Sequence, residues 1–454
     1  MIKTKIIVTY GPSISKAGTL KRILKYADIV RINFSHEKKE EGAATAETIK
    51  RIASSMQKDI AILADLPGPK VRISKLDAPI MVKKGDIITF SSSAAKGAIQ
   101  VQHENFHKDA RVGAYVDIGD GDAKFRISEI NGAKVVTKAV ADGKMSSRKG
   151  ISIIGADMSI SAPTSADLDL ARFVLKNDFD LIGMSFVKSG EDIIKMRKAC
   201  GDAPIVAKIE RKIAVRNIDG IAREADGVMV ARGDLAMGVS LEHIPEAQKT
   251  IIGAARRLGK PAILATQLLT SMINNLSPTR AEVNDIANGV AQGADCLMLS
   301  DETAVGKHPV EAVRFLSRAA KVAEGIPTTL TKEYPKVTSI NGGIAFAASN
   351  LADEFKTDCI FIPTQTGFTA KMISRLRPNT DLIALTMDEK VRKRLSLYYG
   401  VRSIVIGRYG TVDRMFEEVK EIAKRNGIKR YIVVSGSPHT PGSTDTLKYI
   451  ESDN

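Results

Sequence analysis

Short apolar runs alternate with longer stretches of helical periodicity through the first two thirds of the chain. This alternation predicts parallel strands joined by helices, and eight such units favour a closed (β/α)8 barrel. The runs that we assign to strands are residues 3–9, 29–34, 60–66, 181–186, 204–210, 227–232, 261–266 and 296–300. Charged or hydroxyl residues end or follow several of them, where barrels of this kind hold their active sites.

A long interval separates the third predicted strand from the fourth, and its pattern changes to short strands and turns. Residues 125–130 and 133–140 flank Asn131-Gly132, the pair favoured in a two-residue type I′ hairpin. We therefore predict a small all-β lid domain, inserted into a barrel and followed by a C-terminal α/β three-layer domain. The predicted bounds are 1–69 and 150–330 for the barrel, 70–149 for the lid and 331–454 for the C-terminal domain, with its strands near 359–363, 382–386, 403–407 and 431–435.

The chain of 454 residues carries a formal net charge of +15, but its basic residues are scattered among acidic ones and aromatic residues make up only 5%. This pattern argues against nucleic acid as a partner and is compatible with small anionic ligands. Cys200, Cys296 and Cys359 lack the spacing of a zinc site or a disulfide framework. We expect no membrane partner and a cytoplasmic location, because no stretch reaches the roughly 20 apolar residues of a membrane span and the N-terminus lacks a secretory apolar core.

Two carboxylates, Glu210 and Asp234, follow neighbouring predicted strands. Together they suit Mg²⁺ or Mn²⁺, with room for water and substrate oxygens; salt bridges with nearby arginines are the alternative. Lys208 lies two residues before Glu210, so both side chains point to the same side of an extended strand. A lysine beside a metal suits a developing enolate or phosphoryl charge.

Arg31 and Asn33 share one face of the second predicted strand, and Arg72 comes soon after the third. Two arginines suit bidentate binding of phosphate oxygens. With the rim hydroxyls of Thr266 and Ser300, they predict an anionic phosphorylated substrate, phosphoryl transfer aided by positioning and electrostatics, and a proton relay. Neither a G-x-x-x-x-G-K-[ST] loop nor a dinucleotide-binding fingerprint occurs in the sequence.

The sequence resembles the pyruvate kinase family over essentially its whole length, through KTKIIVTYGPS, VRINFSH, KIERKIAVRNIDGI, DGVMVARGDLAMGV, GKPAILATQLLTSMI, PTRAEVNDIANGV and DCLMLSDETAVGKHP. The resemblance implies a (β/α)8 barrel, a mobile β-rich lid, a C-terminal domain and usually a homotetramer. It also implies transfer of the phosphoryl group of phosphoenolpyruvate to ADP, followed by protonation of enolpyruvate to pyruvate, an ATP-forming step of glycolysis. Closure of the lid would exclude water from the transfer.

Residue by residue, the resemblance assigns Glu210 and Asp234 to the divalent metal. It assigns Lys208 to the phosphoryl group and the nascent enolate, and Arg31 to the phosphate. The phosphoenolpyruvate carboxylate would be bound by Gly233, Asp234 and Thr266. The implied protonation route runs past Thr266, Ser300 and Glu302. The positions assigned to the nucleotide are Asn33, His36, Arg72 and Lys149 for its phosphates and Pro12 near the adenosine, with Ser35-His36 at an expected helix start.

One segment, ADLPGPKVRI, departs from the family pattern. It carries Leu66 and Lys70 where potassium-dependent members have threonine and glutamate, while Asn33, Ser35 and Asp65 keep the other potassium-site positions. We therefore expect a vestigial potassium site, in which the ammonium of Lys70 supplies the positive charge, and no requirement for K⁺. A solvent-exposed Lys70 is the alternative.

The segment TQTGFT of the C-terminal domain is similar to the family's effector-phosphate loop. The hydroxyls and amides of Thr364, Thr366, Gly367 and Thr369 would hold a phosphate at a helix start, although ordinary capping by threonine is an alternative. Residues 435–443 lack the tryptophan and arginine of some fructose-bisphosphate-activated members, so we do not expect that effector.

Two rival functions remain open at this point. One is another metal-dependent barrel enzyme acting on phosphoenolpyruvate or pyruvate enolates, such as an aldolase. In such an enzyme the inserted lid and the C-terminal domain would have no evident purpose. A phosphometabolite sensor or RNA-binding protein would use the basic surface without catalysis, and its main activity would survive Lys208→Met.

Overall fold

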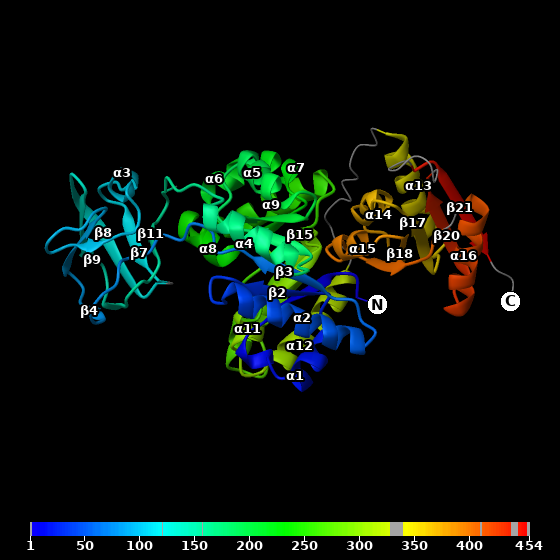
Figure 1. Ribbon diagram of the computed structural model, residues 1–454, viewed down its shortest axis with the longest axis horizontal. Helices are drawn as coiled ribbons and strands as arrows, with labels where there is room; N and C mark the ends of the chain where they lie inside the picture. Colours follow the sequence, from blue (N-terminus) through cyan, green and yellow to red (C-terminus); the bar gives the residue numbers. More distant parts are fainter. Residues whose placement is uncertain are drawn as a thin grey trace.

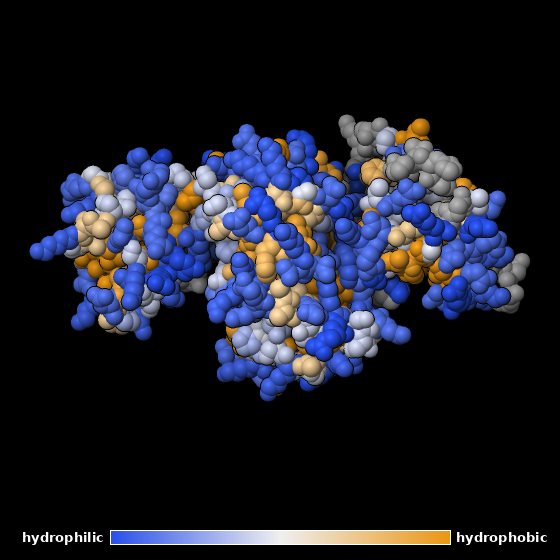
Figure 2. All heavy atoms as spheres, viewed as in Figure 1, coloured by the Kyte–Doolittle hydropathy of each residue, from blue (hydrophilic) through white to orange (hydrophobic). Residues whose placement is uncertain are grey.

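The computed structural model describes residues 2–119, 121–156, 158–326, 339–408, 411–436 and 444–451. Figure 1 shows three units in a row, with a central barrel, a small β-rich lid on one side and a C-terminal α/β domain on the other. On the face drawn in Figure 2, hydrophilic residues predominate, and hydrophobic residues show between the lid strands, in the middle of the barrel and beneath the C-terminal domain. No helix among the described residues is long and apolar enough to cross a bilayer.

The central unit is a closed barrel of eight parallel strands in the order β1-β16-β15-β14-β13-β12-β3-β2, which confirms the predicted fold class. Each strand lies within a predicted run, and because the runs end one or two residues beyond most strands, Glu210, Arg232, Thr266 and Ser300 come directly after the carboxyl ends of their strands. Strands covered on both faces read as continuous apolar runs, which is why the pattern is so clear. The strands are β1 (Lys5–Thr9), β2 (Ile29–Asn33), β3 (Ala61–Asp65), β12 (Leu181–Met184), β13 (Ile205–Ile209), β14 (Gly227–Ala231), β15 (Ala262–Ala265) and β16 (Cys296–Leu299).

Helices with one apolar face surround the barrel, and their buried residues join the outward-facing strand residues in one core. Typical of these is α10, whose N-cap Thr279 and Glu282 form a capping box and whose C-cap Gly293 adopts a left-handed φ of 101°. The barrel helices are α1 (Ala17–Leu24), α2 (Lys39–Ser55), α4 (Ser165–Lys176), α5 (Gly190–Cys200), α6 (Lys212–Arg216), α7 (Ile218–Glu224), α8 (Arg232–Gly238), α9 (Ile244–Arg257), α10 (Arg280–Gln292), α11 (Asp301–Ala304) and α12 (Pro309–Glu324).

The lid comprises a six-stranded sheet, β11-β7-β8-β9-β5-β6, a two-stranded sheet, β10-β4, and the short helix α3 (Phe106–Asp109). The predicted hairpin is present, but Asn131 pairs with Lys134, so the turn residues are Gly132 and Ala133. Because only Gly132 has a positive φ, 56°, the turn follows the type II′ pattern instead of the expected I′ pattern. The strands are β4 (Ile80–Val82), β5 (Ile87–Ser91), β6 (Ile99–Gln100), β7 (Tyr115–Ile118), β8 (Ala123–Asn131), β9 (Lys134–Ala139), β10 (Gly143–Met145) and β11 (Ile151–Ile153).

The C-terminal domain has a five-stranded sheet in the order β19-β18-β17-β20-β21, and its last strand, which the sequence analysis missed, is antiparallel. Residues 327–338, where we expected the boundary with the barrel, lie outside the described residues. The strands are β17 (Cys359–Pro363), β18 (Asp381–Thr386), β19 (Val401–Val405), β20 (Arg430–Ser435) and β21 (Thr446–Glu451), and the helices are α13 (Ile340–Glu354), α14 (Phe368–Ser374), α15 (Glu389–Leu395) and α16 (Val412–Arg425).

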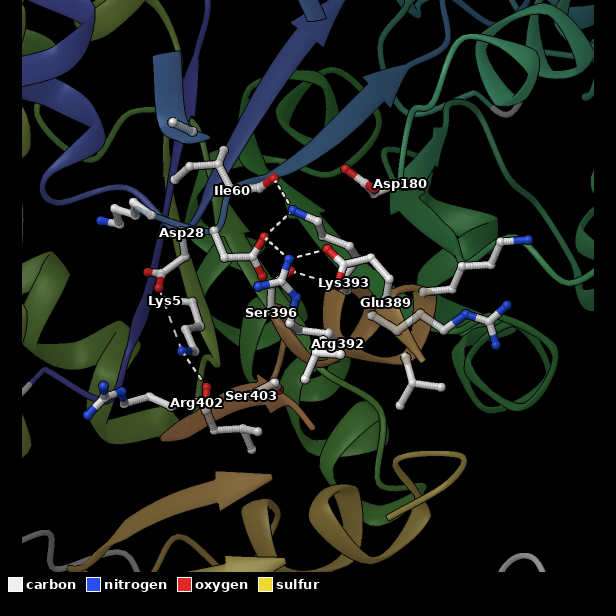
Figure 3. A pocket seen from close by; sticks show the side chains of 18 of the residues that line it. Lys5, Asp28, Ile60, Asp180, Glu389, Arg392, Lys393, Ser396, Arg402 and Ser403 are labelled. Atoms are coloured by element: carbon white, nitrogen blue, oxygen red, sulfur yellow. Dashed lines mark hydrogen bonds and ion pairs between the residues drawn. The ribbon is translucent and has the colours of Figure 1, made fainter. Parts of the chain in front are cut away.

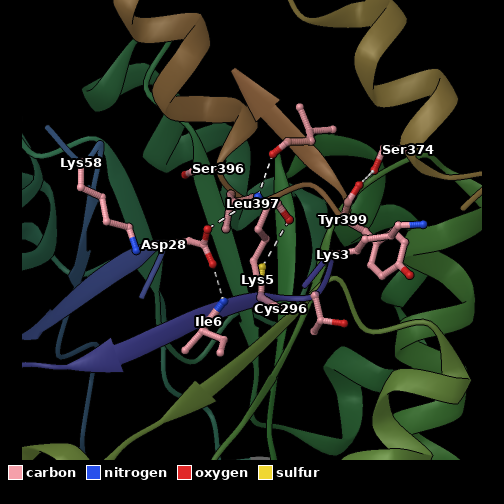
Figure 4. Close-up of polar contacts among 12 residues, drawn as sticks. Lys3, Lys5, Ile6, Asp28, Lys58, Cys296, Ser374, Ser396, Leu397 and Tyr399 are labelled. Atoms are coloured by element: carbon pink, nitrogen blue, oxygen red, sulfur yellow. Dashed lines mark hydrogen bonds and ion pairs between the residues drawn. The ribbon is translucent and has the colours of Figure 1, made fainter. Parts of the chain in front are cut away.

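The C-terminal domain packs against the amino ends of the barrel strands (Figure 4). The buried Lys5 ammonium donates a 2.7 Å hydrogen bond to the Val401 carbonyl, and the Cys296 thiol contacts the Leu397 carbonyl at 3.2 Å. The lid attaches at the opposite end, since it leaves the barrel after β3. The carboxyl ends of the strands therefore open toward the lid.

Candidate active site

A buried carboxylate, Asp65, stands at the carboxyl end of β3 between two cations from other strands. Arg31 on β2 contacts Asp65 Oδ2 through Nε at 2.7 Å and Nη2 at 2.5 Å. The Lys208 ammonium on β13 lies 3.0 Å from Asp65 Oδ1. The exposed side-chain fractions are only 10% for Arg31, 1% for Asp65 and 10% for Lys208. These charges therefore interact with little screening by water.

The Lys208 ammonium is held from two further directions. It lies 2.8 Å from Glu210 Oε1 and donates a 2.8 Å hydrogen bond to Ser185 Oγ. Ser185 Oγ in turn donates to the Leu66 carbonyl at 2.7 Å, and Glu210 Oε2 accepts the Phe186 amide at 2.7 Å. Lys208 and Glu210 thus point to the same side of β13, and the ammonium is fixed in position.

The charges of this cluster shift the pKa values of its members. Burial favours a neutral Asp65, but Lys208 and Arg31 outweigh it and hold the Asp65 pKa below its ordinary value. Burial also favours a neutral Lys208, yet Asp65 and Glu210 hold its pKa well above the ordinary value. The pKa of Glu210 is raised by burial, against the charge of Lys208, and the negative charge of Asp234 raises it further. Asp65 and Lys208 therefore remain charged near neutral pH.

Gly233, Asp234 and Thr266 meet at the ends of β14 and β15. Thr266 Oγ1 accepts a 2.9 Å hydrogen bond from the Gly233 amide, and Asp234 follows in the first turn of α8. Asp234 is half-buried and close enough to Glu210 for its charge to act on that carboxyl. Gly233, Asp234, Thr266 and Glu210 therefore come together at the carboxyl ends of β13, β14 and β15, beside Lys208.

The donor set suits a small divalent cation. In the described part of the chain, no group of three or more His, Cys, Asp and Glu side chains is arranged for a metal. Mg²⁺, however, is commonly bound by one or two carboxylates together with water and substrate phosphate oxygens. Glu210 and Asp234 provide that pair, and a cation between them would remove the like-charge repulsion that raises the Glu210 pKa.

Ser300 and Glu302 lie at the end of β16 and in α11. The buried Glu302 carboxylate accepts the Ser300 amide at 2.8 Å and the Leu269 amide at 3.1 Å. Burial raises the pKa of Glu302, although these backbone hydrogen bonds oppose the shift. The Ser300 hydroxyl is enclosed without a hydrogen-bond partner among the residues described, which leaves it available to a ligand or water.

The residues assigned to the nucleotide lie around the rim. Pro12 is exposed in the 3-10 turn η1 (Pro12–Ile14), and Asn33 Oδ1 accepts the Ser35 amide at 3.1 Å. Ser35 and His36 are exposed in a turn, and the following helix, α2, begins only at Lys39, so the expected helix start at Ser35-His36 is wrong. The Asn33 side chain satisfies the turn locally, which delays the helix.

Arg72 and Lys149 lie on the two connections between barrel and lid. Arg72 Nη1 donates to the Arg148 carbonyl at 2.9 Å, and the Arg72 backbone forms an antiparallel bridge with Gly150. The Lys149 ammonium lies 2.7 Å from Asp122 Oδ2 in the lid. Both side chains are therefore anchored to the connections and the lid, away from the Asp65 cluster.

Lys70 is exposed, and its aliphatic chain runs beside Gly150. Within the described ranges, its ammonium forms no ion pair, and the Asp65 carboxylate is paired with Arg31 and Lys208 instead. Leu66 is buried in the core between the barrel and its helices. In this structure Lys70 thus has the solvent-exposed conformation, which the sequence analysis gave as the alternative to an internal cation.

The threonines of the C-terminal loop make local contacts. Thr364 Oγ1 accepts the Gly367 amide at 3.0 Å, Gly367 has a φ of 80°, and Thr366 is exposed. Thr369 is buried, with its hydroxyl 2.7 Å from that of Thr444. Thr366 Oγ1 accepts the Phe368 amide at 3.4 Å, so all three threonine hydroxyls are engaged in the turn and the domain core. Residues 437–443 of the later segment lie outside the described residues.

A large cavity, about 1830 Å³, lies elsewhere, between the amino end of the barrel and the C-terminal domain (Figure 3). Its lining is rich in charges of both signs. Asp59 pairs with Arg392 and Lys393, while Lys50 lies 3.5 Å from Asp180. The cavity contains none of the site residues predicted from the sequence.

Three polar residues of the site escaped the sequence analysis: Thr9, Ser185 and Asp285. Thr9 Oγ1 accepts a 3.0 Å hydrogen bond from Arg31 Nη1, and Ser185 receives the Lys208 ammonium. Asp285, on α10, lies 2.6 Å from Arg232 Nη1. Thr9 ends one predicted apolar run and Ser185 is the next-to-last residue of another, a signal that was available; Asp285 lies in mid-helix and offers none.

Comparison with known proteins identifies the family. The model of the pyruvate kinase barrel domain matches residues 1–313, and that of the pyruvate kinase alpha/beta domain matches residues 343–450. The pyruvate kinase of Methanocaldococcus jannaschii is 36% identical over 457 residues, covering 99% of this chain and 98% of the relative, and that of Thermotoga maritima is 33% identical over 467 residues, covering 100% of both. The crystal structure of a pyruvate kinase from Cryptosporidium parvum superposes with a TM-score of 0.91 at 30% identity, covering 99% of this chain and 96% of that one. This chain is therefore a member of the pyruvate kinase family of phosphotransferases.

Proposed function

We propose that this protein transfers the phosphoryl group of phosphoenolpyruvate to ADP, producing ATP and pyruvate in the last step of glycolysis. The observation that carries the proposal is the buried cluster of Arg31, Asp65, Lys208 and Glu210 at the barrel opening. It combines two fixed cations for an anionic phosphorylated substrate with a carboxylate suited to a metal. The family relationship supports the same reaction.

In this proposal, Arg31 and Lys208 bind the transferred phosphoryl group, and Lys208 also faces the enolate oxygen left behind. Fixed charges stabilise developing charge without reorganisation, which is the main source of catalysis in phosphoryl transfer. The phosphoenolpyruvate carboxylate is received by Gly233, Asp234 and Thr266. The first turn of α8 favours binding of the carboxylate there, because Gly233 lets a ligand approach the backbone closely.

Glu210 and Asp234 would hold Mg²⁺ or Mn²⁺, which supplies charge neutralisation to the phosphoryl and enolate oxygens when bound. Protonation of the enolate is assigned to the region of Thr266, Ser300 and Glu302. The unpartnered Ser300 hydroxyl and the raised pKa of Glu302, caused first by burial, support a proton route there. We assign ADP and ATP to Pro12, Asn33, His36, Arg72 and Lys149, with lid closure bringing the last two toward the substrate.

We further propose that K⁺ is not required, because Leu66 and Lys70 replace a threonine and a glutamate of the potassium-dependent pattern. On closure of the lid, the exposed Lys70 would swing its ammonium from beside Gly150 toward the vestigial site of Asn33, Ser35 and Asp65. We also propose a homotetramer and a cytoplasmic location, on the basis of the family to which the chain belongs. An effector phosphate is also proposed at Thr364, Thr366, Gly367 and Thr369, whose three threonine hydroxyls form local hydrogen bonds in this structure.

The test is to assay pyruvate formation from phosphoenolpyruvate, ADP and Mg²⁺ in potassium-free buffer, then to exchange an inert cation for K⁺ at constant ionic strength. ADP-dependent pyruvate at full rate without K⁺ supports both parts of the proposal. A many-fold increase with K⁺ contradicts the Lys70 part only. No turnover in either buffer contradicts the kinase assignment and favours an aldolase-like enzyme or a phosphometabolite-binding protein.

A further inference from the structure

Arg232 connects three elements beside the proposed carboxylate subsite. It is the first residue of α8, and its side chain is only 8% exposed. Its Nε and Nη2 atoms donate to the Thr266 carbonyl at 3.2 and 2.6 Å, and its Nη1 atom lies 2.6 Å from Asp285 Oδ2 on α10. Planar guanidinium geometry allows this fork, and lysine cannot reproduce it. Arg232 contacts the backbone of Thr266, not the opening of the barrel where the substrate would lie.

The backbone that Arg232 holds is strained. Thr266 has a φ of 66° and Gln267 a φ of 57°, so two consecutive residues with side chains adopt the left-handed region. A β-branched residue is a genuine outlier there, and the conformation is energetically unfavourable for both side chains. The conformation therefore requires support from its surroundings. Two charge-assisted hydrogen bonds to the Thr266 carbonyl provide that support.

The left-handed turn also determines the direction of the Thr266 hydroxyl. Thr266 Oγ1 accepts the Gly233 amide at 2.9 Å, so Arg232 and Gly233, adjacent in sequence, hold the two polar ends of the same threonine. Because the oxygen already accepts one hydrogen bond on the Gly233 side, its proton points elsewhere. The hydroxyl is then kept as a donor for a ligand in the subsite formed with Gly233 and Asp234.

We propose that Arg232 and Asp285 are positioning residues for the reaction: they lock Thr266 in the left-handed turn and so present its hydroxyl as a hydrogen-bond donor to the substrate. Asp285 anchors the guanidinium on α10, and Arg232 transmits that anchoring to the Thr266 carbonyl. The inference rests on the proposed function for its substrate and deepens it. Neither residue need touch the substrate.

A purely structural role for this pair is the competing explanation, and the chain contains a matched control. Arg197 and Asp226 form another Arg–Asp pair, with Nη2 2.6 Å from Asp226 Oδ2. Arg197 Nη1 also donates to a backbone carbonyl, that of Ala203, at 2.8 Å. This pair lies beside the amino ends of β13 and β14, away from the candidate site. Arg197→Lys therefore removes similar contacts without touching Thr266.

The decisive experiment is a double-mutant cycle with Arg232→Lys and Thr266→Ala, with Asp285→Asn and Arg197→Lys measured alongside. We expect Arg232→Lys to lower kcat about 10- to 100-fold, because small misplacements of a reacting group have effects of that size. In the Thr266→Ala background the same substitution should change kcat less than about 2-fold, since coupled residues are not additive. Asp285→Asn should give a smaller loss in the same direction. Arg197→Lys should leave kcat within about 2-fold of the parent enzyme, because this pair lies beside the amino ends of β13 and β14, away from the candidate site.

A second measurement reports on the turn independently of catalysis. Hydrogen–deuterium exchange of the peptide that contains Gly233 should become faster in Arg232→Lys, because the acceptor of that amide is released, and should stay unchanged in Arg197→Lys. Multiplicative effects of Arg232→Lys and Thr266→Ala on kcat, or unchanged exchange at Gly233, would overturn the positioning role. If the parent enzyme forms no pyruvate, the proposed function fails, while the exchange measurement still tests the turn.

Discussion

Neutralising Asp65 should destabilise the protein far more than neutralising Asp295, a second enclosed carboxylate. Asp65 is paired with both Arg31 and Lys208, and these cations hold its pKa below the ordinary value despite burial. Asp295 Oδ1 lies 3.6 Å from Arg377 Nη2, and burial outweighs the attraction of that cation, so the Asp295 pKa is raised. The fold thus favours the charged form of Asp65 and the neutral form of Asp295. The same Asp→Asn change removes a favourable charge at one position and an unfavourable charge at the other.

Removing one partner of a buried ion pair costs about 3–5 kcal/mol, because the other charge is left uncompensated. Asp65→Asn leaves Arg31 and Lys208 facing each other without the carboxylate that pairs with both, so we expect a loss of about that size, out of a typical total of 5–15 kcal/mol. Asp295→Asn keeps an oxygen that can accept the Ala262 amide, now 2.9 Å from Asp295 Oδ2. We expect that substitution to change the free energy of unfolding by less than about 1 kcal/mol.

The assay is urea unfolding of the parent and both variants between pH 3 and 8, followed by circular dichroism, with equal m-values required for comparison. The folded-state pKa of Asp65 lies below the unfolded value of about 3.9, so its contribution is complete above about pH 4 and fades as the pH falls through the folded pKa. The difference between the parent and Asp65→Asn should shrink only below about pH 4. For Asp295, with a raised folded pKa, lowering the pH toward 4 stabilises the parent relative to Asp295→Asn. Equal losses in the two variants at pH 7 would refute the reasoning.

Three further predictions concern other parts of the molecule. Lys5→Met should reduce the free energy of unfolding by about 1–3 kcal/mol, since the Val401 carbonyl loses a buried 2.7 Å donor, and a thermal scan measures this. Gly289→Ala should cost about 1–3 kcal/mol because its Cβ would meet Leu264 Cδ2, whereas Gly18→Ala, in open space on α1, should be neutral or stabilising in the same denaturation series. Glu210→Gln should weaken Mn²⁺ binding, because it removes a proposed metal ligand. The loss of affinity, measured by electron paramagnetic resonance, should exceed the roughly 10- to 100-fold typical of changes in outer-shell partners. Unchanged affinity would remove Glu210 from the metal site.

The parts of the fold that the sequence predicts are those whose burial is complete. Each barrel strand is enclosed on both faces, so a run such as Ala262–Ala265 is wholly apolar and easily recognised. Strand β21 escaped because its residues are half-buried or exposed and polar ones, including Lys448, interrupt the pattern. In the lid hairpin, Asn131-Gly132 indicated the position of the turn, but cross-strand pairing moved it by one residue. Pairing between strands is a tertiary effect that a dipeptide does not encode.

The candidate site divides in the same way. Residues at strand ends, such as Lys208 and Thr266, are predictable because parallel strands bring their carboxyl ends to one opening. The role of Asp285 is not predictable, since this residue lies 53 positions from Arg232 along the chain, on an ordinary capped helix. The left-handed backbone of Thr266 is equally hidden, because threonine normally avoids that conformation. Local patterns therefore predict which residues face the substrate, whereas the contacts that orient them require the structure.

The charges at the barrel opening indicate why metal and substrate should bind together. Two cations, Arg31 and Lys208, face three carboxylates, Asp65, Glu210 and Asp234, so the cluster is negative when all five side chains are ionised. A phosphorylated carboxylic acid would be repelled by it, whereas a divalent cation at Glu210 and Asp234 reverses the sign. Because such coupling is reciprocal, each ligand should strengthen the binding of the other. The formal charge of +15 on the whole chain does not supply this attraction locally; the arrangement of five buried or half-buried side chains makes it depend on the metal.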